Sequence, residues 1–145
     1  MRLKIAVLCM VGVASAIAQT ASTDDSSKAV VYVYRHQHGS GPPNKPSVYC
    51  DEHELARLES GCYFSIRLDV GKHSCRSTDG QTVVRLDVKA GQTYYIRGEV
   101  VPVHGPRGAL YQVSSEQGAS ELRGLKPLSS GMVKDSSRVL LDPPK

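Results

Sequence analysis

The stretch CYFSIRLDVGKHSCRSTDGQTVVRLDVK, residues 62–89, indicates the fold class. Apolar and polar residues alternate in two runs, the pattern of strands that bury one face and leave the other in water. The expected inward sets are Cys62, Phe64, Ile66 and Leu68 in the first run, and Val84, Leu86 and Val88 in the second. A sheet with one wet face is antiparallel more often than parallel.

Turn signals bound these runs and continue beyond them. Asp79-Gly80 is the strongest, because both positions of a type I′ turn need positive φ and these residues tolerate it. The others are Asp51-Glu52, Ser60-Gly61, Val70-Gly71 and Ala90-Gly91. A turn at intervals of about 8–12 residues is typical of an all-β sandwich or barrel. We therefore predict an antiparallel β-sandwich.

The flanking sequence adds further strands and one helix. The run VVYVYR (30–35) is apolar or aromatic on both faces, which suits a strand buried on both sides. Residues 93–101 alternate again, and all seven tyrosines fall within predicted strands. Ser114 and Gln117 form a capping box, so a short C-terminal helix is expected before Gly124. The sandwich domain is predicted to span residues 29–128, with a flexible leader at 19–28 and a polar C-terminal tail at 129–145.

The first eighteen residues have the features of a signal peptide. Arg2 and Lys4 precede an apolar run over residues 5–17, and Ala16-Ile17-Ala18 offers a small-x-small cleavage site. The run is shorter than the roughly 20 residues that a membrane-spanning helix needs. The alternative is a buried core helix. We expect an exported protein, periplasmic or secreted, with no stable membrane span after cleavage before Gln19.

Cleavage would change both the charge and the cysteine count. The mature chain would carry 16 basic and 14 acidic side chains, a balance too small to support nucleic-acid binding. Cys50, Cys62 and Cys75 would remain, so at most one intramolecular disulfide is expected. If Val70-Gly71 is a two-residue hairpin turn, Ile66 lies opposite Cys75, and Cys62 is too far along the strand to bond it. Cys50 is therefore the expected member of the disulfide, with its partner left open.

Four segments together resemble the bacterial family Domain of Unknown Function 2846. They are VYVYR (31–35), VYCDEHELARLESGCYFSIRLDVGKHSCRS (48–77), LDVKAGQTYYIRGEV (86–100) and VSSEQGASELRGLKPL (113–128). The resemblance implies an exported β-rich domain, similar to transthyretin-like or carboxypeptidase-regulatory sandwiches, with no assigned activity. Many such sequences read Asp-Gly where this chain has Asp51-Glu52.

No catalytic motif stands out, so we expect a protein that is not an enzyme and holds no cofactor. There is no G-x-S-x-G elbow and no glycine-rich phosphate loop. His36 and His38 lie on one side of an extended segment and are the candidates for a metal site, which His53, His73 or His104 could complete. The alternative for the pair is a solvated loop entrance.

An arginine recurs on the outer face of the predicted strands. Arg67, Arg85 and Arg97 each accompany an acidic residue, as in the echo RLDV at 67–70 and 85–88. They could be a surface for an acidic partner protein or an anionic envelope glycan, or cross-strand charge pairs that keep the sheet in solution. The predicted turns place Lys72 between Asp69 and Asp87, which is the arrangement of such a ladder.

The function we expect from the sequence is a non-enzymatic binding or accessory module of the bacterial cell envelope. One alternative is a metal-binding or enzymatic periplasmic protein that uses the His36/His38 region. Another is a structural protein that pairs with an envelope partner by addition of a strand to a sheet edge.

Overall fold

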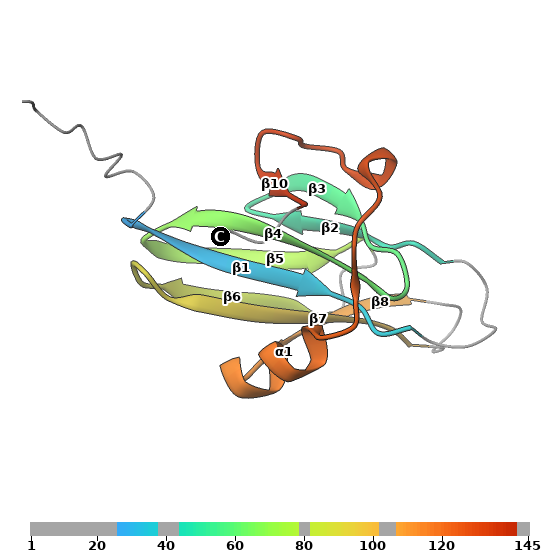
Figure 1. The fold of residues 1–145 in the computed structure, drawn as a ribbon. Coiled ribbons are helices and arrows are strands. Elements are labelled where there is room, and N and C mark those ends of the chain that lie inside the picture. Colours follow the sequence, from blue (N-terminus) through green and yellow to red (C-terminus); the bar gives the residue numbers. More distant parts are fainter. Residues whose placement is uncertain (1–25, 38–43, 79–81, 102–106, 142–145) are drawn as a thin grey trace, which may run out of the picture.

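The alternating runs form strands of two sheets packed face to face (Figure 1). The structure is a computed structural model that describes residues 26–37, 44–78, 82–101 and 107–141. The strands are β1 (Lys28–Tyr34), β2 (Ser47–Cys50), β3 (His53–Arg57), β4 (Cys62–Asp69), β5 (Gly71–Ser77), β6 (Val83–Val88), β7 (Thr93–Val101), β8 (Arg107–Val113), β9 (Lys126–Pro127) and β10 (Val139–Leu140). The helices of the described residues are α1 (Ser115–Leu122) and the 3₁₀ turn η1 (Ser130–Met132). The predicted all-β sandwich with a short helix is confirmed.

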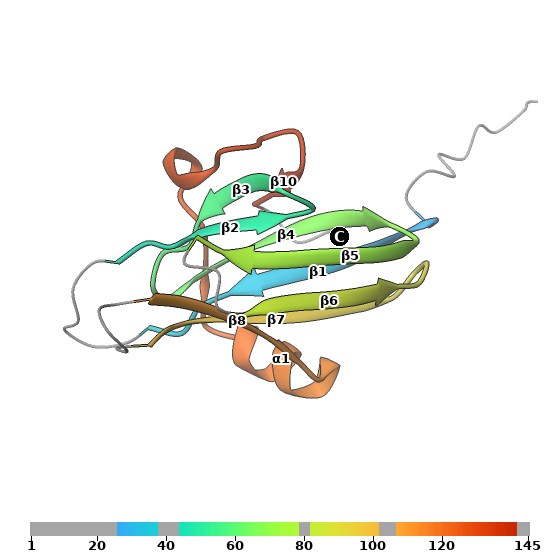
Figure 2. The same ribbon diagram turned by 180° about the vertical axis from the view of Figure 1, so that it is seen from behind.

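The six-stranded sheet has the order β10-β4-β1-β7-β8, with β9 beside β4, and the four-stranded sheet has the order β3-β2-β5-β6. Most neighbours are antiparallel as predicted, but β1 pairs with β7 in parallel, and so does β4 with β9. β1 lies at the centre of its sheet, so Val31 and Val33 are fully buried on its inner face. The helix α1 packs against the neighbouring strand β7, and Figure 2 shows it from behind.

The chain changes sheet between β4 and β5, so the predicted hairpin at Val70-Gly71 is wrong. β4 belongs to the six-stranded sheet and β5 to the four-stranded one. Gly71 has φ 136°, a conformation that glycine adopts without steric cost. The inner faces of β4 and β5 thereby belong to opposite layers of the sandwich, whereas a hairpin would lay both on one sheet.

This crossing also separates the predicted charge ladder. Lys72 lies opposite Asp87 in the register of β5 and β6, as expected from the Asp79-Gly80 turn, which itself lies outside the described residues. Asp69 lies in the other sheet, where it is opposite Lys28 and 3.9 Å from its amine. Lys72 is therefore not held between two carboxylates of adjacent strands.

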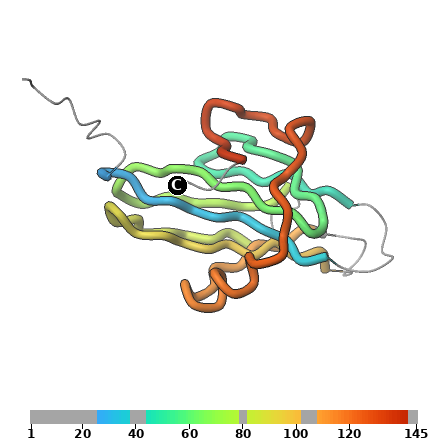
Figure 3. Tube along the Cα trace, in the orientation of Figure 1, coloured from blue at the N-terminus to red at the C-terminus, as the bar shows by residue number. Residues whose placement is uncertain are grey.

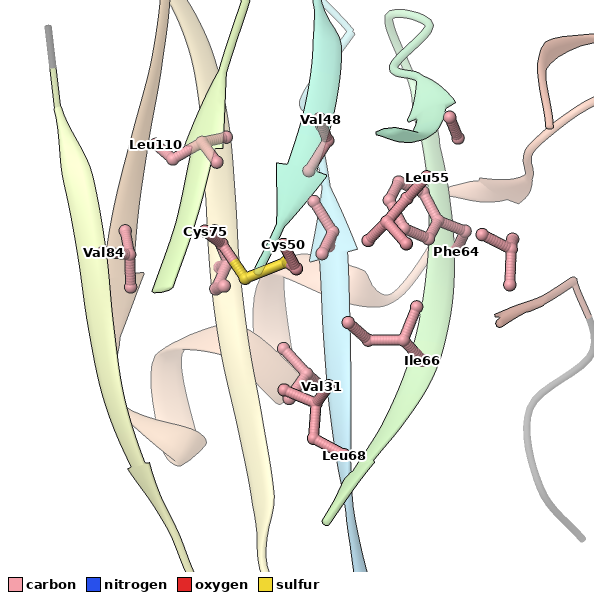
Figure 4. Packing of buried hydrophobic residues seen from close by; sticks show 14 of the residues in the cluster. Val31, Val48, Cys50, Leu55, Phe64, Ile66, Leu68, Cys75, Val84 and Leu110 are labelled. Carbon is pink, nitrogen blue, oxygen red and sulfur yellow. A yellow bond between two sulfur atoms is a disulfide. The ribbon is translucent and has the colours of Figure 1, made fainter. Parts of the chain in front are cut away.

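A disulfide joins Cys50 and Cys75 inside the core (Figure 4). The two residues are directly opposed on β2 and β5, with Cα atoms 4.1 Å apart. Both side chains point inward among Val48, Leu110 and the other buried residues of the cluster. Cys62 is a free, half-buried thiol at the start of β4.

The C-terminal segment is part of the fold rather than a polar tail. From α1 it runs across the end of the six-stranded sheet to β3 and returns to β4 (Figure 3). The backbone N–H groups of Lys134 and Asp135 donate to the carbonyl of Leu55 at 2.8 and 3.1 Å, and Val139 is buried beside β4. The predicted boundary at residue 129 is therefore too early. The apolar residues 139–141 were the signal for this strand, but two paired residues are too few for a periodic pattern.

The helix begins where the capping box predicts. Ser114 accepts a hydrogen bond from the backbone N–H of Gln117 at 3.2 Å, and α1 ends at Leu122. Gly118 lies against the ring of Tyr95, so closely that a Cβ atom at this position would overlap the ring. This glycine allows the helix to pack directly on the outer face of β7.

Reduction of the disulfide is expected to lower the free energy of unfolding by about 3 kcal/mol, because the cross-link closes a loop of 25 residues. Urea unfolding with and without a reductant measures the difference. The matched control is Cys62→Ser, which should leave the effect of the reductant unchanged. Thiol counting on denatured, unreduced protein of residues 19–145 should find one free cysteine. Three free thiols would contradict the pairing.

Candidate binding site

A hollow of about 520 Å³ lies on the four-stranded sheet, over β5 and β6 beside the β2–β3 turn. Lys72, Ser74, Arg85 and Asp87 line it from the two strands, and the register places Lys72 opposite Asp87 and Ser74 opposite Arg85. Asp51, His73 and Leu86 complete the lining. The alternation that buries Leu86 and Val88 therefore presents the charged residues of β6 to solvent.

Two cationic side chains of the hollow have no bonding partner among the described residues. Within the part of the chain that the structure describes, the side chains of Lys72 and Arg85 form neither a hydrogen bond nor an ion pair. The neighbouring Arg76 differs, because it is bound to Glu52 at 3.0 Å and stacks over the ring of Tyr49. An arginine and a lysine that are not neutralised by the protein are available to a carboxylate or another anion.

His73 is fixed at the border of the hollow by hydrogen bonds at both ring nitrogens. Its Nδ1 lies 2.5 Å from the carboxylate of Asp51, and its Nε2 lies 2.7 Å from the backbone carbonyl of Asp69. A carbonyl oxygen only accepts, so Nε2 carries a proton, and the carboxylate favours a second proton on Nδ1. Partial burial lowers the pKa of His73, but these two bonds outweigh it, and the pKa lies above its ordinary value.

The Asp51–His73 pair is thus a clamp and not a catalytic dyad. In a dyad the Nε2 atom faces a nucleophile, whereas here it is occupied by the end of β4. The clamp joins the β2–β3 turn of one sheet to the last residue of β4 in the other. Asp51 also accepts from the backbone N–H of Ser74 at 3.0 Å, and its pKa is lowered because its bonds to His73 and Ser74 outweigh the opposing effect of burial.

The same turn has an unusual backbone. Asp51 and Glu52 both have positive φ, 48° and 64°, which non-glycine residues rarely adopt. The turn forms without the glycine of the common Asp-Gly sequence because its two side chains are anchored on β5, Asp51 to His73 and Glu52 to Arg76. The sequence predicts this turn, but nothing in its pattern marks Asp51 as a site residue.

A second polar cluster lies under α1, on the six-stranded sheet. The hydroxyl of the buried Tyr34 donates to the Glu121 carboxylate, and Arg97 Nη1 and Gln117 Nε2 contact it at 3.2 and 2.8 Å. His36 Nε2 lies 3.3 Å away. Although partial burial raises the pKa of Glu121, the bonds from Tyr34, Gln117 and His36 and the charge of Arg97 lower it to about 2. Burial, then the bond to Glu121, raises the pKa of Tyr34. Donors occupy both oxygens, so the cluster fastens the helix to the sheet.

The predicted arginine surface is divided by the fold. Arg85 belongs to the four-stranded sheet, whereas Arg67 and Arg97 belong to the six-stranded one. Arg97 is engaged by Glu99 at 2.8 Å and by Glu121. The three residues therefore do not form one surface. The sequence echo RLDV marks strands with the same alternation, but it carries no information on which sheet each strand joins.

The predicted histidine pair is represented by His36 alone, because His38 and His104 lie outside the described residues. His36 contacts Glu121 and packs edge-on against the ring of Tyr34, with ring centroids 5.8 Å apart. Among residues 26–37, 44–78, 82–101 and 107–141, no three His, Cys, Asp or Glu side chains form a group that could hold a metal ion. His53 and His73 lie on β3 and β5 of the other sheet.

The fold and the hollow define an all-β sandwich with a charged depression on one sheet, and comparison with known proteins gives the family. The family model described as "Protein of unknown function (DUF2846)" matches residues 25–106, more than half of the chain. The protein belongs to this family, as the resemblance predicted. The match ends before α1. No curated protein and no solved structure matches the chain. No helix in the described part of the chain has the length and apolarity to cross a membrane.

The clamp predicts a dependence of stability on pH. Because the pKa of His73 is raised on folding, its contribution is complete below the unfolded value, about 6.5, and is lost as the pH rises through the folded value. The difference in unfolding free energy between wild type and His73→Gln should be largest near pH 5, about 1 kcal/mol, and should shrink in alkali. Urea unfolding across this range measures it. An identical difference at pH 5 and pH 9 would contradict an imidazolium in the clamp.

Loss of Glu121 should release the helix. Glu121→Ala leaves the buried hydroxyl of Tyr34 without an acceptor and should cost about 1–3 kcal/mol. Because the pKa of Glu121 is depressed on folding, this contribution is present above pH 4.3 or so and is lost as the pH falls towards about 2. Chemical unfolding measures both effects. Glu116→Ala, an exposed change on the same helix, is the matched control and should be close to neutral.

Proposed function

We propose that this protein is an exported, non-enzymatic binding module of the bacterial cell envelope, which holds an acidic partner protein at the hollow over β5 and β6. The observation that carries the proposal is that Lys72 and Arg85 line one depression and neither has a partner among the described residues. Arg76 and Arg97, by contrast, are each bound to a carboxylate. Two cations that are left open beside each other favour recognition of an anion.

The surroundings of the two cations suit a carboxylate. Arg85 supplies a planar fork of donors and Lys72 a mobile ammonium. Ser74 lies on β5 opposite Arg85, with its side chain on the same face, so its hydroxyl is a further donor. The charged His73 adds positive potential at the border, although Asp51 neutralises much of it. Asp87 lies next to Lys72 and disfavours dense polyanions, so a partner with spaced acidic groups fits better than a nucleic acid.

Two features support export. The first eighteen residues have the composition of a signal peptide, and they lie outside the described part of the chain. The Cys50–Cys75 pair is a disulfide of the kind that persists in oxidising compartments such as the periplasm. Its position inside the core makes it a structural bond rather than a redox centre.

Charge removal at the hollow tests the proposal. The purified mature protein, wild type or Lys72→Ala/Arg85→Ala, is immobilised, and its association with the envelope protein fraction is measured at low and high ionic strength. We expect the double variant to lose at least about tenfold in retained partner, since two charge-assisted contacts disappear. High salt should reduce the wild-type signal in the same way.

The matched control is Arg57→Ala/Arg123→Ala, which removes two exposed arginines away from the hollow and should leave association unchanged. Equal losses in both double variants would show a general charge effect and contradict a site. Retention of purified peptidoglycan instead of protein would favour the glycan as the partner and would overturn this form of the proposal. Melting curves of all variants exclude unfolding as the cause.

A further inference from the structure

Strand β6 is the last strand of the four-stranded sheet, and its outer edge faces β8 of the other sheet. Among the described residues no strand pairs with that edge. A small hollow of about 400 Å³ lies between the two strands, lined by Thr82, Val83, Val84, Leu110, Tyr111 and Gln112. Val83 and Tyr111 are two of the large apolar residues that remain exposed, at 42% and 38%.

Hydrogen bonds identify which backbone groups of β6 point to this edge. The carbonyl of Ser74 accepts from Asp51 N–H on the β2 side of β5. The backbone N–H and C=O groups of Ser74 and of its partner Arg85 therefore point away from each other. Alternate residues of a strand direct their N–H and C=O groups to the same side. The backbone groups of Val83, Arg85 and Asp87 therefore face the free edge.

The two ends of the edge are closed by side chains. At one end Thr82 Oγ1 accepts from the N–H of Leu110 at 2.8 Å, which ties β6 to β8. At the other end the Tyr94 hydroxyl donates to the carbonyl of Asp87 at 3.3 Å and accepts from the N–H of Lys89 at 3.0 Å. Between these ties, no described residue bonds the N–H and C=O groups of Val83 and Arg85.

We propose that the free edge of β6 binds an extended acidic segment of the partner by addition of a strand, with backbone hydrogen bonds to Val83 and Arg85. This rests on the proposed function and names the conformation in which the partner is held. The segment's outward side chain opposite Arg85 is acidic, because the side chains of Arg85 and Lys72 on that face have no partner among the described residues. Its inward side chain opposite Val84 is apolar, because it meets Leu110 in the hollow.

A second copy of this chain fits the edge less well. Two β6 strands paired about Arg85 would set two arginines directly opposite each other, which is destabilising. Pairing that sets Arg85 opposite Asp87 of the second copy would need the carbonyl that Tyr94 already occupies. Charge complementarity thus selects an acidic segment of another protein.

The probe for the test is a capped five-residue peptide, threonine-valine-glutamate-valine-valine, added to the isotope-labelled mature protein. We expect chemical-shift changes at the amides of Val83 and Arg85. Two further peptides of the same sequence carry N-methyl groups on alternate residues, in one of the two possible registers each. The peptide whose methyl groups replace the N–H donors to β6 should bind about tenfold more weakly. The lysine-for-glutamate peptide should bind weakly to wild type and should recover with Arg85→Glu.

Val83→Pro is the matching protein variant. It removes an N–H that faces the free edge and leaves the bonds between β5 and β6 in place, a position at which an edge strand tolerates proline. We expect it to weaken the peptide about tenfold. Strand addition is wrong if Val83→Pro binds the parent peptide as wild type does and both N-methylated peptides bind like the parent peptide. If Lys72→Ala/Arg85→Ala still abolishes capture of the envelope partner, the proposed binding at the hollow is retained. If the double variant also retains its partner, the proposed function fails as well.

Discussion

The change of sheet at Val70–Gly71 is the constraint on which the rest of this structure depends. β4 and β5 are nearly continuous in sequence, yet each must bury its apolar face. Placing them in opposite sheets brings Phe64, Ile66 and Leu68 of β4 into one buried cluster with the disulfide and Val48 of the other sheet (Figure 4). A hairpin would have left one of these faces without a partner layer.

The crossing also explains why the clamp at His73 is needed. Only one residue, Val70, lies between the two strands, so the end of β4 and the start of β5 are held close while their sheets diverge. His73 ties the carbonyl of Asp69 to the carboxylate of Asp51, and Asp51 in turn stabilises a turn with two positive φ angles. Geometry, charge and backbone strain are therefore coupled at the border of the hollow. A ligand that competes for Asp51 or His73 would act on the fold itself.

Much of the fold follows from local patterns. The inward sets of β4 and β6, the register that places Lys72 opposite Asp87 and the cap at Ser114 all depend on neighbours in sequence, and sequence reasoning found them. Sheet membership does not depend on neighbours. A turn of one or two residues at Val70-Gly71 is compatible with a hairpin or with a crossing, and nothing in the run RLDVGK distinguishes them. The error therefore spread to every inference that combined the two strands, including the ladder at Lys72 and the common arginine face.

The sites were harder to predict than the strands. Lys72 and Arg85 are ordinary members of an alternating pattern, and only the three-dimensional hollow shows that both are left without partners. The role of Glu121 could not be predicted from the sequence, because all its partners except Gln117 come from β1, β7 and the segment after β1, up to 87 residues away. Cys50 was reached by excluding a bond between Cys62 and Cys75, through a hairpin that does not exist. The structure pairs Cys50 with Cys75, so Cys50 is a member of the disulfide as predicted, although the hairpin on which that prediction depended is absent.

The distribution of tyrosines determines what optical spectroscopy can report on this protein. The chain has no tryptophan, so its near-ultraviolet absorption and emission come from seven tyrosines. Six of them lie on the six-stranded sheet, where Tyr32 stacks on Tyr95 with ring centroids 5.5 Å apart and Tyr34 is bound to Glu121. Tyr49 alone lies on the sheet that carries the hollow, beneath Arg76. Near-ultraviolet signals of the natural chain thus describe mainly the six-stranded sheet. Two of its tyrosines also lie at β6, because Tyr94 bonds the backbone of Asp87 and Lys89 and Tyr111 lines the hollow between β6 and β8.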